Sequence, residues 1–383
     1  MLRHQYHTYG EVPASDLRDE EEGVSVVAES SSSLDEDKHE ELEVPCTELE
    51  EDMFGMVICS LVRDTHDIFA RQGNTTGRAF RLLTSCLVLV FCISIQCFLL
   101  SKVKHFVTAK AVHDIRVAYD QFETIMYSNT TTNMNGHHRG VDGSFDPNRF
   151  GKLSEDVQSA VCRIPLSQPD FFFVILSIWT LTCFGEVKQC IVLFRSLVLN
   201  THNCNSMVNA LSKYEDLSTE GSDFLVASLP VYMKLVIGML VIVPRLLITL
   251  LLTWLGCRWL LATTNFADLI LNAVALEFIL VLKNTLYVTL MTSKNKDDRA
   301  TTKVLPATPT QRAGLHVFIG AMLWIFFAAF WVVLYMGVPH KMEGLQKVLP
   351  GYKWDVQAVC TSWISWRYCV DDDCPTSVHY DSM

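Results

Sequence analysis

The side chains best suited to chemistry in this chain of 383 residues stand inside long apolar runs. One run, residues 231–255, carries Arg245 near its middle. The next run, residues 265–291, carries four polar or charged side chains: Asp268, Asn272, Glu277 and Lys283. A charge at the centre of a bilayer costs about 3 kcal/mol on insertion scales, so such residues normally face protein, water or one another. These two runs are where we expect a functional site.

The polar side chains of residues 265–291 divide between two sides of a helix. At roughly 100° per residue, Asp268, Asn272 and Lys283 fall within about 60° of one another, and Glu277 and Asn284 lie on nearly the opposite side. A helix that is polar on two sides cannot face lipid on both, so at least one side must face protein. Asp268 and Lys283 stand near the two ends and could reach the interfaces, whereas Glu277 stands near the middle.

This pattern has two interpretations. In the functional one, Glu277 is the acceptor of an ion or proton pathway, Arg245 is its charge partner, and Asp268 and Asn272 line the pathway. In the structural one, a buried Arg245–Glu277 pair fixes helix packing and Asn272 forms a hydrogen bond between helices. Pro244 predicts a kink that frees a backbone carbonyl, which is compatible with both interpretations.

The composition is that of a membrane protein with an acidic leading segment. Half of the residues are hydrophobic, at 50%, and the long apolar runs all follow residue 80. The net charge of −11 arises between residues 16 and 52, which hold sixteen acidic and two basic side chains. Without a basic face, no nucleic-acid partner is expected. The expected partner is the lipid bilayer.

Five apolar runs are long enough to cross a hydrocarbon core of about 30 Å. They lie near residues 82–101, 170–190, 231–255, 265–291 and 314–338. We therefore expect an all-α membrane protein with about five transmembrane helices in a domain at 82–338. Hydrophobic residues keep helical spacing from Val103 to Met126, which predicts that the first helix extends several turns beyond the membrane.

The N-terminal part divides into two segments. Residues 1–52 are expected to be a disordered, acidic, cytoplasmic tail, because they hold too little apolar surface to offset the entropy of ordering. Ser32 and Ser33 each have an acidic residue three positions on, which fits an acidophilic kinase; the alternative is a purely solvating tail. Residues 53–81 are expected to form an amphipathic juxtamembrane helix. This helix lies on the membrane surface, packs under the bundle, or is an ordinary soluble amphipathic helix.

Five spans with a cytoplasmic N-terminus place the loop near residues 102–169 and the tail 339–383 outside. No cleavable signal peptide is recognised, so the first span is expected to act as an anchor. Four cysteines on this outer side could form two disulfides in any of three connectivities: Cys162, Cys360, Cys369 and Cys374. Asn129 begins a glycosylation sequon in the loop, but Asn74 begins another that would lie on the opposite side.

No motif indicates an enzyme, a cofactor or a metal site. The chain lacks the zinc-protease, serine-hydrolase, phosphate-loop and dinucleotide signatures. Asp142, Ser144 and Asp146 imitate the start of a calcium loop, but Pro147 stands where the turn needs glycine and Leu153 where it needs glutamate. We therefore expect neither catalysis nor a bound metal.

The segment Asn272–Phe278, N-A-V-A-L-E-F, resembles a segment of multi-pass membrane proteins from unicellular algae and other protists. There too, a short polar stretch precedes this core. The resemblance covers the two adjoining runs around it, about a sixth of the chain. It implies a shared membrane core, in which Asn272 and Glu277 match, and it implies no activity.

The leading functional hypothesis is an ion channel or a transporter of ions or small solutes. Five helices rarely enclose a pore alone, so this hypothesis implies a homo-oligomer. The alternative is a membrane receptor or scaffold that transports nothing. In that case the external region binds a partner, and the acidic tail recruits cytoplasmic proteins.

Overall fold

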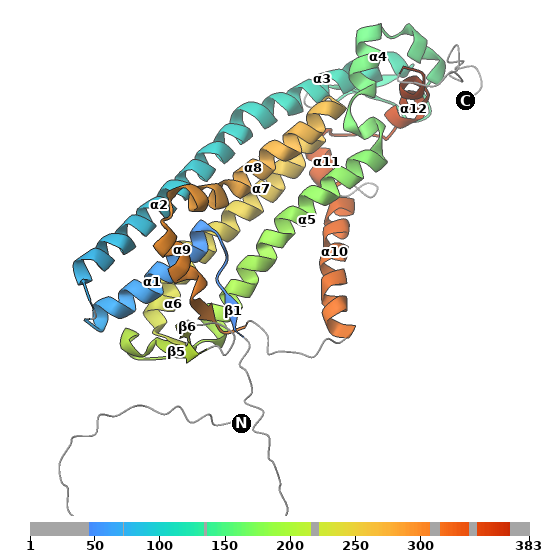
Figure 1. The fold of residues 1–383 in the computed structure, drawn as a ribbon. Helices are drawn as coiled ribbons and strands as arrows, with labels where there is room; N and C mark the ends of the chain where they lie inside the picture. The colour runs from blue at the N-terminus through green and yellow to red at the C-terminus, as the bar shows by residue number, and fades with distance from the viewer. Residues whose placement is uncertain are drawn as a thin grey trace, which may run out of the picture. The chain divides into compact units, whose positions relative to one another are not determined.

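The computed structural model describes six stretches of the chain: residues 46–71, 73–133, 136–215, 222–306, 315–336 and 343–367. The described part is mostly helical, as expected, and its long helices run side by side (Figure 1). Ser32, Ser33, Cys369 and Cys374 lie outside the described residues.

Four helical segments are long and apolar enough to cross a membrane: Thr75–Met126, Pro169–Asn200, Val231–Leu261 and Phe318–Met336. They confirm the helical class and are consistent with an integral membrane protein. The fifth predicted span, residues 265–291, forms helix α8 (Phe266–Leu290) but is not one of these four segments.

The first long segment is one continuous helix that extends far past the predicted span. Helix α2 (Thr75–Lys102) passes through a π-helical stretch, Val103–Thr108, into α3 (Ala109–Met126). The return helix α5 (Pro169–Phe194) likewise continues through a π-helical stretch, Arg195–Asn200.

Pro244 coincides with an irregularity in the third long segment. Helix α6 (Val231–Ile237) joins α7 (Val243–Leu261) through a π-helical stretch at Gly238–Ile242. Proline has no N–H, and its ring clashes with the carbonyl four residues earlier, which here belongs to Leu240. Widening the helix to π geometry relieves this clash.

One end of the bundle, which we call the α1 end, combines a buried helix with short strands. Helix α1 (Met53–Phe69) packs against α2, α8 and α9 (Ser293–Ala300), and its residues 53–62 are all buried. A four-stranded sheet lies beside it in the order β1 (Thr47–Glu48), β8 (Thr302–Val304), β6 (Ser222–Val226) and β5 (Leu211–Glu215). A second pair joins β4 (His202–Asn203) and β7 (Ser228–Leu229).

Two expectations for the N-terminal part need correction. Residues 46–52 are ordered, because β1 pairs with β8 and Asp52 caps α1, so the predicted disordered tail ends earlier than residue 52. The segment 53–81 is not one helix, because a turn after Phe69 separates α1 from α2. The purely helical expectation also missed the short strands of this end.

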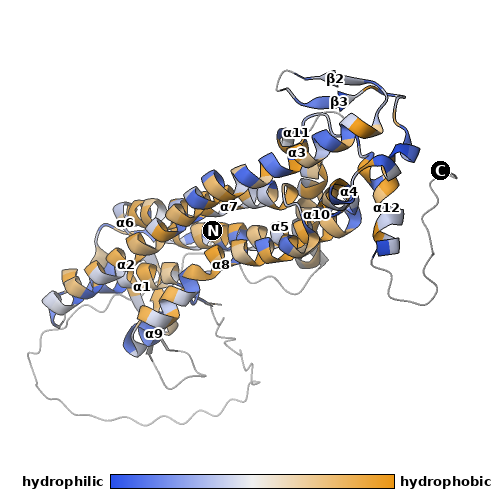
Figure 2. Cartoon of the chain, turned by 90° about the horizontal axis from the view of Figure 1, so that it is seen from above, coloured by the Kyte–Doolittle hydropathy of each residue, from blue (hydrophilic) through white to orange (hydrophobic). Residues whose placement is uncertain are grey.

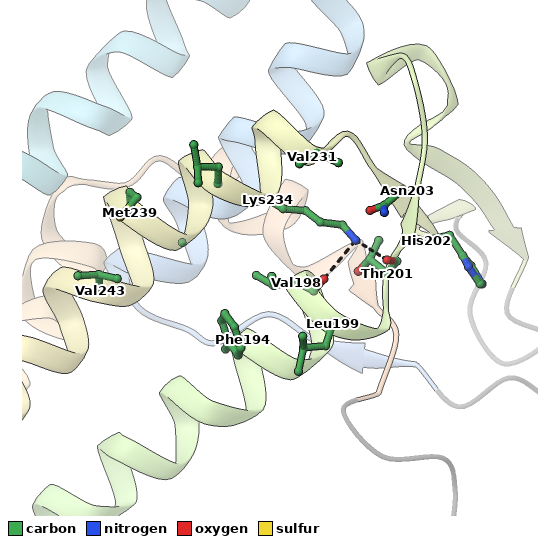
Figure 3. Close-up of a pocket in the computed structure, with 12 residues that line it drawn as sticks. Phe194, Val198, Leu199, Thr201, His202, Asn203, Val231, Lys234, Met239 and Val243 are labelled. Atoms are coloured by element: carbon green, nitrogen blue, oxygen red, sulfur yellow. Dashed lines mark hydrogen bonds between the residues drawn. The ribbon is translucent and has the colours of Figure 1, made fainter.

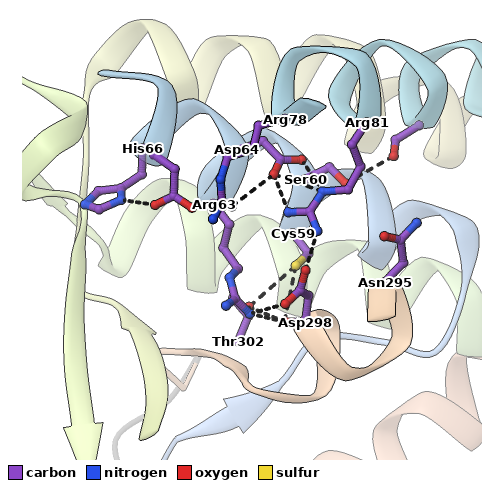
Figure 4. A network of polar contacts seen from close by, with 12 residues as sticks. Cys59, Ser60, Arg63, Asp64, His66, Arg78, Arg81, Asn295, Asp298 and Thr302 are labelled. Carbon is purple, nitrogen blue, oxygen red and sulfur yellow. Dashed lines mark hydrogen bonds and ion pairs between the residues drawn. The ribbon is translucent and has the colours of Figure 1, made fainter. Parts of the chain in front are cut away.

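A network of ion pairs ties α1 to α2 and α9 (Figure 4). Arg81 Nε donates to both carboxylate oxygens of Asp64, at 3.0 and 2.9 Å, and Arg81 also pairs with Asp298. Arg63 lies 3.3 Å from the same Asp298. Since Asp64 is fully buried, these bonds hold a carboxylate that would otherwise be costly to bury.

The opposite end, which we call the disulfide end, is a small polar region built on α3. It holds the antiparallel hairpin β2 (Thr130–Thr132) and β3 (His138–Gly140), with α4 (Glu155–Cys162), α11 (Glu343–Val348) and α12 (Val356–Arg367). Cys162 and Cys360 form a disulfide, which joins α4 to α12. Polar residues are frequent in the hairpin and α12 at this end, as they are in α9 at the α1 end, while hydrophobic residues follow the long helices (Figure 2). The last long helix, α10 (Leu315–Met336), packs on α5.

Candidate functional site

Three long helices each bring one charged side chain to the same depth in the bundle. Glu186 lies about 17 residues from the start of α5, Arg245 about 16 residues from the end of α7, and Lys283 about 17 residues from the start of α8. At 1.5 Å per residue, each stands about 25 Å from the disulfide-end terminus of its helix. Charges on neighbouring antiparallel helices therefore meet at one level.

These side chains form a tight set of contacts. Glu186 Oε2 accepts from Arg245 Nη2 at 3.0 Å and from Lys283 Nζ at 2.6 Å. Gln189, one turn after Glu186, accepts from the same Arg245 Nη2 at 2.8 Å. Arg245 and Lys283 are buried, with exposed fractions of 3% and 5%.

The segment before α1 adds two carboxylates to this site. Asp52 Oδ2 lies 3.2 Å from Lys283 Nζ and 3.5 Å from Arg245 Nη2. Asp52 also caps α1, since its Oδ1 accepts from Gly55 N at 2.8 Å. Glu50 lies 2.7 Å from Arg245 Nη2. We call the five residues Glu50, Asp52, Glu186, Arg245 and Lys283 the charge cluster.

The two carboxylates outside the spans respond differently to this environment. Burial raises the pKa of Glu50, and the nearby Arg245 offsets this only in part. Burial also acts to raise the pKa of Asp52, but Arg245, Lys283 and the Gly55 N–H outweigh it and hold that pKa below its usual value. Asp52 is therefore the firmly ionised partner, and Glu50 is the carboxylate that takes up a proton first.

Arg245 contacts its partners through only one nitrogen of its guanidinium group, Nη2. All its bonds to Glu50, Glu186 and Gln189 run through Nη2, whereas the buried Nε and Nη1 have no hydrogen-bond partner among the described residues. The ring of Phe54 lies beside the group, with Arg245 Cζ 5.3 Å from its centroid. Buried donors without acceptors are rare in proteins and call for a bound water or ion.

The expected Arg245–Glu277 pair was wrong. Arg245 turns inward to Glu50, Asp52 and Glu186, while Glu277 lies on the exposed outer side of α8. The reason is the helical wheel itself, since the inner side of α8 carries Lys283 and leaves Glu277 on the other side. The structure therefore gives Arg245 a different partner set and leaves Glu277 outside the charge cluster.

Asp268 and Asn272 also lie away from the charge cluster. They line a separate cavity of about 330 Å³ at the disulfide end, together with residues of α3 and the end of α7. Asn272 Nδ2 donates to Thr263 Oγ1 at 3.0 Å, which ties α8 to the connection that follows α7. About 15 residues separate Asp268 from Lys283, or about 22 Å along the helix axis.

Most of the charge cluster escaped the sequence reasoning. The apolar pattern did not single out Glu186 within the run 170–190, and it placed Lys283 near a helix end, within reach of an interface. Their depth would have indicated them, because Glu186 and Lys283 lie about as far from the disulfide-end termini of their helices as Arg245 does. For Glu50 and Asp52 no such signal existed, since their acidic surroundings are typical of a solvated tail.

A second cavity, of about 630 Å³, lies near the α1 end between the end of α5 and helix α6 (Figure 3). Its walls are largely apolar, with Phe194, Leu235 and Met239 among them. Lys234 Nζ donates to the carbonyl oxygens of Val198, at 3.2 Å, and of Thr201. The ammonium thus satisfies the last carbonyls of the preceding helix, which is a structural role.

Within the described residues, no group of three or more His, Cys, Asp or Glu side chains is placed to hold a metal ion. No family model matches the chain, and neither the curated proteins nor the solved structures include a similar one.

Proposed function

We propose that this protein carries small anions across a membrane, and that Arg245 and Lys283 bind the anion. One observation supports this most directly. The long helices α5, α7 and α8 alone contribute two cations and one carboxylate to the charge cluster, so their own part of the site carries one net positive charge. Glu50 and Asp52, which come from a segment outside the long helices, bring the complete cluster to one net negative charge. When this segment is withdrawn, the site formed by Arg245, Lys283 and Glu186 favours anions.

In the proposed mechanism, Glu50 and Asp52 occupy the place of a transported anion. Their oxygens lie against Arg245 and Lys283 as an anionic substrate would. For an anion to enter, the segment with Glu50 and Asp52 must move away from the site, or one of these two carboxylates must give up its contact with Arg245 or Lys283. The unpartnered Nε and Nη1 nitrogens of Arg245 offer donors to the entering anion.

The proposed orientation places the α1 end in the cytoplasm. The described stretch 293–306, which includes α9 at this end, carries four Lys or Arg against two Asp, and an excess of Lys and Arg is typical of cytoplasmic loops. The Cys162–Cys360 disulfide lies at the other end, and disulfides persist in oxidising compartments. Both features favour a cytoplasmic N-terminus and an external disulfide end.

The test is anion flux into liposomes that contain the purified full chain. We expect chloride, nitrate or iodide to move, Arg245→Gln to lower the flux at least tenfold, and the double variant Glu50→Gln/Asp52→Asn to raise it. Lys188→Gln serves as the matched control, because Lys188 is an exposed cation on α5 that makes no ion pair among the described residues. If the unchanged chain moves none of these anions, the proposal fails, whatever the variants do.

The disulfide end favours a second candidate function. It is a compact polar region with a surface hairpin, β2–β3, and a disulfide, which suits a receptor or scaffold that binds an external partner. In that case the acidic N-terminal segment would recruit cytoplasmic proteins. Deleting residues 369–383 or shortening the hairpin would then abolish partner capture while the liposome assay shows no flux.

A further inference from the structure

We propose that two copies of this chain associate in the membrane through one exposed face of α8. Seven exposed residues follow one another along this helix at alternating spacings of three and four. They are Ala267, Ile270, Val274, Glu277, Val281, Asn284 and Val288. We call them the α8 stripe. This spacing repeats every 3.5 residues on average, which is the repeat of a helix that packs along another helix.

The stripe suits neither lipid nor water alone. Val274 and Val281 are 58% and 41% exposed, as expected of a surface in contact with hydrocarbon. Between them stands Glu277, about halfway along α8, and one turn beyond Val281 stands Asn284. Neither polar side chain has a hydrogen bond or ion pair with any described residue. A carboxylate at this depth is costly in lipid, so this face requires a protein partner.

The apolar residues of the stripe suit packing against one other helix. Val274, Val281 and Val288 recur every seven residues, and β-branched residues at such a position favour a pair of parallel helices. Two copies inserted in the same orientation are related by a two-fold axis along the membrane normal. Their α8 helices then run parallel, so each residue of the stripe meets the same residue of the other copy.

This arrangement satisfies both polar side chains at once. An asparagine amide both donates and accepts, so the two Asn284 side chains can form hydrogen bonds to each other. The two Glu277 carboxyl groups can share one proton, with one O–H donating to the other carboxylate. A different protein would need a matching group at each of two depths, whereas a second copy supplies both. The inference does not depend on anion transport, because Lys283 lies on the other side of α8.

The first experiment is disulfide cross-linking in membranes, in a Cys97→Ser background that removes an exposed native thiol. Val281→Cys lies in the stripe, and Leu247→Cys is its control, since Leu247 stands at a similar depth on α7 and is 53% exposed. We expect oxidation to give at least tenfold more cross-linked dimer for Val281→Cys. Equal cross-linking at both positions would overturn the proposal.

The second experiment counts photobleaching steps of the labelled, otherwise unchanged chain in liposomes at several protein densities. We expect two steps, with Glu277→Ala or Asn284→Ala lowering the association constant about three- to thirty-fold each. Glu277→Gln should keep most of the association, because two amides can still bond to each other. Single steps at every density, or no effect of Glu277→Ala, would refute the proposal even if the cysteine variants failed to insert.

Discussion

The charge cluster makes a quantitative prediction about Glu186. Replacing Glu186 with glutamine removes the carboxylate that contacts both Arg245 Nη2, at 3.0 Å, and Lys283 Nζ, at 2.6 Å. Removing one partner from a buried ion pair costs about 3–5 kcal/mol, because it leaves a buried charge without compensation. The Glu186 side chain is 18% exposed and Asp52 remains as a partner, so we expect a loss of about 3 kcal/mol in the free energy of unfolding.

A second substitution separates the pair from the individual side chains. Lys283→Met alone removes a cation and should also destabilise the protein. With Glu186→Gln and Lys283→Met together, neither member of the contacting pair is left facing an absent partner, and Arg245 still faces Glu50 and Asp52. We therefore expect the double variant to lose about 2 kcal/mol less than the sum of the two single variants, within the range seen for residues in contact.

The assay is reversible unfolding in detergent, followed by circular dichroism, for the four members of this cycle. Lys188→Gln removes a charge two residues away on the exposed side of α5 and should change the free energy by less than about 0.5 kcal/mol. Additive effects, with a coupling below about 0.5 kcal/mol, would show that Glu186 and Lys283 do not stabilise each other. An equal loss for Lys188→Gln would point to a general effect of charge on this helix.

Three further predictions concern the ends of the bundle and the N-terminal carboxylates. Cys162→Ser, Cys360→Ser and the double variant should lower stability equally, by up to about 5 kcal/mol for a cross-link 198 residues apart in sequence, as measured by thermal unfolding; unequal losses would contradict a single shared bond. Asn129, exposed at the disulfide end, should acquire a glycan that Asn129→Gln removes, whereas Asn74, which caps α2 at the α1 end, should not; a glycan on Asn74 instead would reverse the proposed orientation. Because burial raises the pKa of Glu50 above its ordinary value of 4.5, acidification from neutral pH towards that value should protonate it and weaken its hold on Arg245, while Asp52, whose pKa is lowered, stays charged. Anion flux should therefore rise as the pH falls over this range, and an equally steep rise in Glu50→Gln would exclude Glu50 as its cause.

Hydrophobic length was sufficient to predict the long helices of this protein. Each of the five apolar runs coincides with a helix, although the first helix extends far past its run, because a helix is the form that satisfies the backbone of a long apolar segment locally. The extension of α2 into α3 was also predicted, because hydrophobic residues keep helical spacing beyond the end of the apolar run. The involvement of Cys162 and Cys360 in a disulfide was also predicted, but the choice among connectivities was left open.

Partnership between charged residues depended on the tertiary structure. The sequence shows that Arg245 and Glu277 are both near the middle of apolar runs, and pairing them was the simplest inference. Which side of a helix faces its neighbours depends on how the helices rotate against one another, and this rotation is set by the packing of many side chains. The rotation of α8 turned Lys283 inward and Glu277 outward.

The N-terminal segment shows the limit of local reasoning most clearly. Glu50 and Asp52 stand in an acidic stretch whose composition indicates a solvated tail. Only the folded chain, in which β1 pairs with β8 and α1 is buried against α2 and α8, brings these carboxylates within reach of Arg245 and Lys283. The sequence by itself thus determined the helices and their approximate depth. The tertiary structure decided which charges meet, because that depends on contacts between residues that lie from 59 positions apart, for Glu186 and Arg245, to 231 positions apart, for Asp52 and Lys283.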